Sequence, residues 1–211
     1  MTAVLIAGAT GAVGSRVLEM ALADPRLERV VAPTRRPLTT TTPELINPVV
    51  DFADLDPTDE WWQVDAVVCA LGTTRKEAGT AAAFRHVDHA LPVRIGELTR
   101  AAGATAYGLV SSVGADATSR NLYLRTKGEA ESDLAALGFD SLTIVRPSAL
   151  LGGRRTRTTT LGDRLGEASR HVAPLLPARV RPVHVDQVAA ALLEAIARPR
   201  PGIQVVVNAS L

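Results

Sequence analysis

The sequence predicts an α/β protein with a doubly wound parallel sheet and helices on both faces. Short apolar runs alternate with segments of helical periodicity, which is the pattern of strand–helix–strand units. Hydrophobic residues make up 46% of the 211 residues and aromatic residues only 3%, so the core must be aliphatic, as in buried parallel strands. No repeat or composition shift divides the chain, and residues 1–211 are expected to form one domain.

The first strand and the turn after it are expected to bind a nucleotide. Val4–Ile6 form a short apolar run, and Gly8, Gly11 and Gly14 follow before a segment of helical spacing. Strand, glycine turn and helix in this order are the setting of a dinucleotide-binding fingerprint. Backbone N–H groups at the helix start would face a pyrophosphate, and Gly14 would let the helix pack close to the strand. The alternative is a tight turn that packs without a ligand.

Six further strands are predicted from short apolar runs that end in glycine, proline, serine or charged residues. Right-handed crossovers between them would place helices on both faces of the sheet. The predicted strands are Arg29–Thr34, Pro48–Phe52, Asp65–Leu71, Tyr107–Val110, Ser141–Val145 and Ile203–Val207.

Four further helices are predicted between and after these strands. Phe84–Ala102 carries a long helical pattern, which Pro92 should kink or shift and Gly103 should end. The other predicted helices are Leu122–Leu137, Leu161–Val172 and Gln187–Ala197, the last with Asp186 as its N-cap.

The charge balance gives no argument for nucleic acid or a membrane as a partner. The net charge is +1, from 23 basic and 22 acidic side chains. Cys69 is the only cysteine, which excludes an internal disulfide and a cysteine-based metal site, and the histidines show no metal-ligand spacing. No basic segment precedes the first apolar run, so no signal peptide is expected. We expect a cytoplasmic monomer or homodimer that acts on a small molecule.

Arg35 and Arg36 follow the second predicted strand, about twenty residues beyond the glycine turn. In this fold a carboxylate at that position holds the ribose hydroxyls of NAD, whereas a basic residue accommodates the 2′-phosphate of NADP. Two guanidinium groups suit phosphate, so NADP(H) is preferred over NAD(H). The alternative is a pair of solvated arginines at the entrance to a loop.

The ends of the third and fourth predicted strands lie at the same edge of the sheet. Asp51 and Phe52 could hold the adenine there, or the carboxylate could simply cap a helix. In open α/β sheets ligands bind where the strand order reverses, which places four further residues against the cofactor: Ala70, Leu71, Gly72 and Thr73.

Ser112, Tyr123 and Lys127 form a possible catalytic set. Ser111 and Ser112 end the fifth predicted strand, and Tyr123 and Lys127 share one helix face at i, i+4 spacing. A nearby ammonium favours a phenolate, so Tyr123 could exchange a proton with a carbonyl or alcohol. Ser112 would hydrogen-bond the substrate oxygen, and Lys127 would also hold the nicotinamide ribose. The alternative is an ordinary amphipathic helix with an exposed lysine.

These motifs resemble the short-chain dehydrogenase/reductase superfamily in its atypical branch, through GATGAVG, the strand-end SS and YLRTK. Longer segments resemble bacterial NAD(P)-binding oxidoreductases related to the Tat-interacting tumour-suppressor oxidoreductase: CALGTTRKEAGT, SSVGADATSRNLYLRTKGEAE, RPSALLGGR and RPVHVDQVAAAL. The resemblance covers nearly the whole chain and implies a Rossmann fold that binds NADP(H). It also implies a small C-terminal portion, with residues 147–185 partly over the substrate cleft.

The resemblance assigns roles residue by residue. Ser112, Tyr123 and Lys127 would be the catalytic set, and Ser111 and Pro147 are expected to lie against the cofactor. Residues that would line the pyrophosphate are Thr10, Gly11, Ala12 and Val13.

One position departs from the family pattern. Many reductases carry an Asn as a fourth catalytic residue, whereas this chain reads FRHVDHA there, with Asp88 as the nearest candidate. A proton relay through Asn therefore does not carry over directly.

Three arginines after Pro147 and one histidine near the last helix are further candidate residues. Arg154, Arg155 and Arg157 could draw in an anionic substrate, although a solvated loop is the favoured interpretation. His184 is assigned to packing of the C-terminal portion rather than to chemistry.

Two functions follow from the sequence. The first is an NADP(H)-dependent oxidoreductase acting on a small carbonyl, alcohol or quinone, with Tyr123 as acid and base. The second is a non-catalytic NADP(H)-binding regulator that senses redox state and binds a protein partner. The intact Ser–Tyr–Lys set favours the first.

Overall fold

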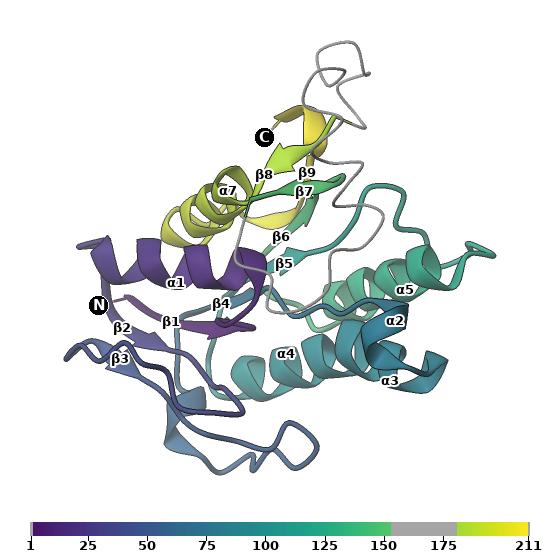
Figure 1. Ribbon diagram of the computed structural model, residues 1–211. Helices are drawn as coiled ribbons and strands as arrows, with labels where there is room; N and C mark the ends of the chain where they lie inside the picture. The colour runs from purple at the N-terminus through teal and green to yellow at the C-terminus, as the bar shows by residue number, and fades with distance from the viewer. Residues whose placement is uncertain (1, 153–180, 211) are drawn as a thin grey trace.

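The computed structural model describes residues 2–152 and 181–210 and shows one large parallel sheet (Figure 1). Its strands lie in the order β3-β2-β1-β4-β5-β6-β9, and every neighbouring pair is parallel. This order reverses between β1 and β4, which confirms the predicted Rossmann-type doubly wound sheet. The strands are β1 (Thr2–Ala7), β2 (Leu27–Val31), β3 (Leu45–Ile46), β4 (Ala66–Cys69), β5 (Ala106–Val110), β6 (Ser141–Arg146) and β9 (Gly202–Val207).

Helices cover both faces of the sheet, as predicted. In Figure 1, α1 (Ala12–Ala23) and α7 (Val185–Ala197) lie on one side, and α4 (Leu91–Ala101) and α5 (Leu122–Ala136) on the other. A separate small sheet pairs β7 (Leu150–Leu151) with β8 (Val183–His184). The shorter helical elements are η1 (Glu60–Trp62), α2 (Arg75–Ala78), α3 (Ala81–Arg85), the π-helical turn η2 (His86–Ala90) and η5 (Asn208–Ser210).

Strand β1 shows how the sheet separates two aliphatic cores. Val4 and Ile6 belong to the core under α1 and α7, whereas Leu5 belongs to the core under α4 and α5. All three side chains are fully buried, and each such burial stabilises the fold by about 1.5–3 kcal/mol relative to exposure. A strand covered on both faces needs apolar residues on both, which explains the continuous run seen in the sequence.

The long helical pattern around Pro92 forms three consecutive pieces. Helix α3, the turn η2 and α4 follow one another without a loop from Ala81 to Ala101. Pro92 has no N–H to donate and its ring would clash with a carbonyl one turn earlier, so the wider π turn precedes it. Gly103, with φ of +108°, ends the helix as predicted.

The predicted third strand over Pro48–Phe52 is wrong. Strand β3 is shorter and lies earlier, and only an isolated bridge from Thr34 to Val49 extends the pairing. Pro48 offers no N–H, and Asp51 closes a turn by accepting a bond from the backbone N–H of Ala53 (2.9 Å). The backbone is therefore drawn out of the ladder before Phe52.

The predicted N-cap of the last helix is also wrong. His184 caps α7, which begins at Val185, and the His184 ring accepts a bond from the backbone N–H of Asp186 (3.4 Å). The Asp186 carboxylate instead lies 2.5 Å from the guanidinium of Arg16 on α1. His184 thus has a structural role, in line with the assignment to packing.

Several expectations fall on residues 153–180, outside the described residues. They concern the helix Leu161–Val172 and the arginines Arg154, Arg155 and Arg157. Within residues 2–152 and 181–210, no helix is long and apolar enough to cross a membrane.

Candidate functional site

The glycine turn forms a tight cradle where β1 meets α1. Gly8 has φ of +86°, and its carbonyl accepts a bond from the N–H of Gly11 (2.9 Å). A Cβ added at Gly14 would come within 2.7 Å of the carbonyl carbon of Gly8 and closer still to its oxygen. A Cβ at Gly8 would meet the backbone of Ala70 at 2.8 Å. Only glycine fits both positions, and the cradle lies at the point where the strand order reverses.

The predicted pyrophosphate residues divide into a rim and a base. Thr10 and Gly11 are exposed and Ala12 is half-buried, whereas the side chain of Val13 is buried beneath α1. Gly11 is the N-cap of α1 and makes no side-chain cap bond. The first N–H groups of this twelve-residue helix therefore face outward beside backbone that carries no side chain, a setting that suits a phosphate anion.

Gly11→Val is expected to abolish dinucleotide binding while the fold survives. A Cβ at Gly11 would come 3.3 Å from the Gly8 carbonyl oxygen, which small shifts can relieve, but the branched side chain would fill the exposed rim. Calorimetric titration with NADPH, alongside circular dichroism to confirm folding, tests this expectation. Gly14→Val is the contrasting variant, because it should disrupt folding itself. If the folded Gly11→Val protein binds NADPH with normal affinity, the pyrophosphate is not bound at the glycine turn.

Arg35 and Arg36 lie just beyond β2, and both side chains are exposed. Thr34 fixes the backbone there: its hydroxyl donates to the Arg36 carbonyl (2.7 Å) and accepts from the Asn47 amide (2.8 Å). Across the described part of the chain, neither guanidinium has an acidic partner. Two unneutralised cations at the end of β2 suit an anionic group on the ligand.

Phe52 and Asp51 lie beside a cavity of about 370 Å³, but only Phe52 lines it. Leu55, Leu91 and Arg94 also contribute to its wall. Asp51 is exposed and already accepts the Ala53 N–H bond. The ring is therefore better placed for an apolar contact than the carboxylate is for a polar one.

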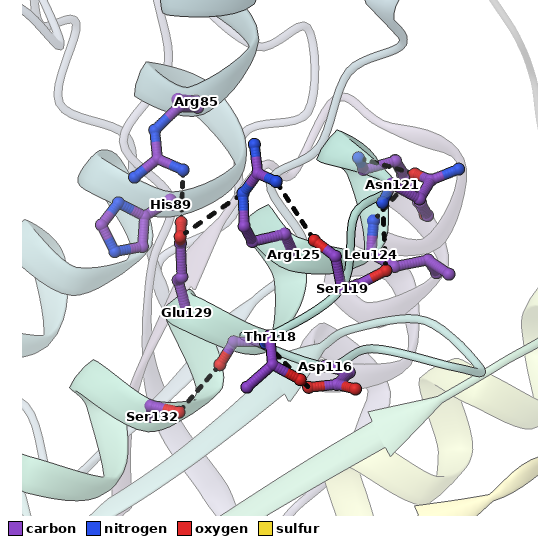
Figure 2. A network of polar contacts seen from close by, with 12 residues as sticks. Arg85, His89, Asp116, Thr118, Ser119, Asn121, Leu124, Arg125, Glu129 and Ser132 are labelled. Carbon is purple, nitrogen blue, oxygen red and sulfur yellow. Dashed lines mark hydrogen bonds and ion pairs between the residues drawn. The ribbon is translucent and has the colours of Figure 1, made fainter.

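A network of polar contacts fixes the start of α5, as Figure 2 shows. The Asn121 side chain caps the helix by accepting bonds from the N–H groups of Tyr123 (2.9 Å) and Leu124 (3.3 Å). Arg125 donates to the Ser119 carbonyl in the preceding loop (3.1 Å). Helix capping of this kind stabilises by about 1 kcal/mol. Tyr123 is thereby held in the first turn of α5.

Further contacts order the loop before α5 and join α5 to the helices beside it (Figure 2). Thr118 donates twice to Asp116, and these bonds lower the pKa of the Asp116 carboxyl. Glu129 forms an ion pair with Arg85 of α3, and the His89 ring lies 2.7 Å from a carboxylate oxygen of α5. The π turn and the helix that carries Tyr123 are therefore held together.

Of the two tyrosines, only Tyr123 can reach a ligand. Its side chain is 38% exposed, and its ring centroid lies 5.9 Å from that of Phe84. Tyr107 is buried and donates to the Pro92 carbonyl (2.9 Å), and burial raises the pKa of this phenol well above its usual value. Tyr107 is thus a structural hydrogen-bond donor, and Tyr123 is the candidate for proton transfer.

Lys127 lies one turn further along α5 and is buried. Its ammonium pairs with the Asp88 carboxylate (2.9 Å) and donates to the Val110 carbonyl at the end of β5 (3.4 Å). Asp88, on the π turn, also accepts a bond from the backbone N–H of Thr73 (2.8 Å). The ion pair therefore joins α5, the end of β5 and the loop after β4. Gly72 is exposed, and Ala70 and Leu71 are half-buried at the same edge.

The two strand-end serines have different surroundings. Ser111 is buried and donates its hydroxyl to Glu131 of α5, which also forms an ion pair with Arg146 (Nε to Oε1, 3.0 Å). Ser112 is half-buried, and among the residues that the structure describes its hydroxyl makes only a long bond to its neighbour's carbonyl (3.3 Å). The hydroxyl of Ser112 is therefore available to a substrate, and Ser111 can offer the cofactor only its backbone.

The segment after β6 is tied to the C-terminus. The Pro147 carbonyl accepts a bond from Val113 N–H (2.9 Å). Asn208 accepts from the N–H of Ser148 (3.0 Å) and donates to the Arg181 carbonyl (2.6 Å). Pro147 thus lies beside the loop that follows Ser112.

Sequence reasoning did not find the Glu131–Arg146 pair or the contact between Asp88 and Lys127. One signal was available: Glu131 lies one turn after Lys127 and so shares its buried face. Nothing local marks Arg146 or Asp88 as partners, because both contacts are long-range.

A family model for NAD(P)H-binding proteins matches residues 8–199, which include the glycine cradle, the Asp88–Lys127 pair and Tyr123. The chain belongs to this NAD(P)H-binding family. Protein FMP52, mitochondrial, from Candida albicans is 37% identical over 160 residues, 71% of this chain and 68% of that protein. Protein HTATIP2 from Rattus norvegicus is 39% identical over 156 residues, 72% of this chain and 64% of that protein. These relatives confirm the resemblance drawn from the motifs.

Solved structures of this family's fold are also similar to the chain. MoeE5 in complex with UDP-glucose and NAD has a TM-score of 0.74 at 21% identity, covering 96% of this chain and 74% of that one. A putative NAD-dependent epimerase/dehydratase from Bacillus halodurans has a TM-score of 0.69 at 22% identity, covering 99% and 97%. At these identities the likeness shows the fold alone.

Proposed function

We propose that this NAD(P)H-binding protein is an NADP(H)-dependent oxidoreductase of the short-chain dehydrogenase/reductase type, acting on a small carbonyl, alcohol or quinone. The observation that carries the proposal is the exposed phenol of Tyr123 one helical turn from the buried ammonium of Lys127. The end of β5, which Lys127 contacts, leads directly into Ser112. An exposed phenol, a buried cation and a half-buried hydroxyl are thus carried by elements that meet at one edge of the sheet.

The residues present fit a dinucleotide. Close packing at Gly8 and Gly14 holds the start of α1 against the end of β1, and the exposed rim at Thr10 and Gly11 would let a pyrophosphate reach the first N–H groups of the helix. Arg35 and Arg36 would hold a 2′-phosphate, Phe52 would contact the adenine, and Lys127 would hold the nicotinamide ribose. When bound, the cofactor supplies or accepts the hydride.

The protein's own residues would handle the proton. In the reductive direction Tyr123 would donate its phenolic proton to the carbonyl oxygen as negative charge develops there. The Ser112 hydroxyl would hydrogen-bond the same oxygen and stabilise that charge. The Lys127 ammonium would favour the phenolate that remains. In the oxidative direction the phenolate would take the proton from the alcohol.

The cofactor preference is expected to be NADPH over NADH by at least about tenfold in affinity, roughly 1.4 kcal/mol. Arg35→Ala or Arg36→Ala should reduce this preference, because each removes an unneutralised guanidinium at the end of β2. Calorimetric titrations with both nucleotides measure the preference. Arg94 lines the cavity beside Phe52, so Arg94→Ala is the matched control. It should leave the ratio of NADPH to NADH affinity unchanged. Equal affinities for NADPH and NADH would show that Arg35 and Arg36 do not bind the 2′-phosphate.

The proposal includes a cytoplasmic monomer or homodimer with a small-molecule substrate. The FMP52 relatives carry "mitochondrial" in their names, so a fluorescent fusion in the native cell is the test of location. The functional test is NADPH consumption with a panel of carbonyl compounds and quinones. Turnover with at least one compound supports the oxidoreductase. NADPH binding without any turnover would favour the regulator, whose partner binding should follow cofactor occupancy.

A further inference from the structure

Asp88 lies between two hydrogen-bond donors. Its Oδ1 is 2.9 Å from the Lys127 ammonium, and its Oδ2 accepts a bond of 2.8 Å from the backbone N–H of Thr73. Asp88 is 1% exposed and Lys127 4% exposed, so water does not replace either contact. The carboxylate therefore bridges helix α5 and the loop after β4, which is the edge where the cofactor residues gather.

The chemistry of this position requires a carboxylate. A carboxylate accepts hydrogen bonds through both oxygens, whereas an asparagine side chain accepts through one atom and donates through the other. Asparagine would therefore turn an N–H donor toward either Lys127 or Thr73, both of which are donors themselves. The surroundings of Asp88 thus explain why this chain carries an acid where many reductases carry an amide.

The contacts of Lys127 define what it can offer a ligand. Its ammonium has three N–H donors, of which one is directed to Asp88 and one to the Val110 carbonyl. Within residues 2–152 and 181–210, one donor is left for a ligand. Removing one partner of a buried ion pair leaves the other charge uncompensated, so loss of the Asp88 charge should displace the ammonium.

We propose that Asp88 is a positioning residue that fixes Lys127 for the nicotinamide half of NADP(H), and that only a carboxylate serves at this position. The inference rests on the proposed function, because it assumes that Lys127 holds the nicotinamide ribose. Asp88 acts through Lys127 and itself touches neither substrate nor cofactor. The Asp88 side chain also holds the loop at Thr73, so it positions Lys127 and this loop relative to each other.

The test is a double-mutant cycle on NADPH affinity in the full-length protein, with Asp88→Asn, Lys127→Met and the double variant. Asp88→Asn and Lys127→Met are each expected to weaken NADPH binding by about tenfold, the value of one charge-assisted hydrogen bond. Adding Asp88→Asn to Lys127→Met should cause no further loss. Adenosine 2′,5′-bisphosphate, which lacks the nicotinamide half, should bind all variants equally well.

Asp133→Asn is the matched control, because this exposed carboxylate pairs with His89 on the same π turn but does not contact Lys127. It should leave NADPH affinity unchanged. Additive losses in the double variant, or equal loss of adenosine 2′,5′-bisphosphate binding, would overturn the inference. If Asp88→Asn alone does not fold, the NADPH affinities of Lys127→Met and of the double variant are compared instead, and equal affinities are expected. Failure of the unchanged protein to bind NADPH would instead remove the proposed function and this inference together.

Discussion

Tyr123→Phe is expected to lower kcat by about 10²–10⁴ while leaving NADPH affinity nearly unchanged. The substitution keeps the ring and its contact with Phe84 but removes the phenolic proton. Because the Tyr123 side chain is exposed, no buried hydrogen bond is lost and the fold should be unaffected. Steady-state kinetics with an active substrate, and a calorimetric titration with NADPH, measure the two effects separately.

Tyr107→Phe is the matched control, since Tyr107 is the other tyrosine of the chain. Its hydroxyl donates to the Pro92 carbonyl inside the core, so the variant should lose about 0.5–1.5 kcal/mol of stability and retain kcat. A Tyr123→Phe enzyme with the kcat of the unchanged protein would show that another group transfers the proton.

Glu131→Ala is expected to reduce the free energy of unfolding by about 3 kcal/mol. Glu131 is 6% exposed and accepts bonds from Ser111 and Arg146. Its removal therefore takes this acceptor away from the Arg146 guanidinium and from the buried Ser111 hydroxyl. The Glu131 carboxylate, which accepts from Arg146, raises the pKa of that guanidinium in the unchanged protein. Arginine stays protonated even without such a partner, so in the variant Arg146 cannot relieve the loss by releasing a proton. Equilibrium urea unfolding measures the effect.

Glu129→Ala provides the comparison on the same helix. Glu129 pairs with Arg85 and Arg125 near the surface, where ion pairs contribute about 0–1 kcal/mol. Similar losses in Glu129→Ala and Glu131→Ala would contradict the view that Glu131 anchors α5 to β5 and β6.

The fold could be predicted because its signals are local. The run at Val4–Ile6, the three glycines and the apolar spacing after them specify a strand, a turn and a helix within a few residues. The same holds for β4, β5 and β6, which begin or end within about two residues of expectation. The third strand was predicted too late in the chain, because Pro48 and an Asx turn at Asp51 compete with the ladder there.

The candidate site could be predicted only in part. Helix periodicity was enough to predict Tyr123 and Lys127 one turn apart on the same helix, as the structure has them. The partners that set their surroundings come from other elements: Asp88 from the π turn for Lys127, and Arg146 from β6 for Glu131. Such contacts depend on how the helices pack, and no sequence spacing encodes them.

The central claim is tested most directly by following deuterium from the reactive C4 position of labelled NADPH. The compound used is the carbonyl substrate that the consumption screen identifies. The oxidoreductase proposed here predicts deuterium on the former carbonyl carbon, with one NADPH oxidised per molecule reduced and a much slower reaction in Tyr123→Phe. A product without deuterium, or labelled NADPH that is bound and never consumed with any compound of the panel, would contradict the claim.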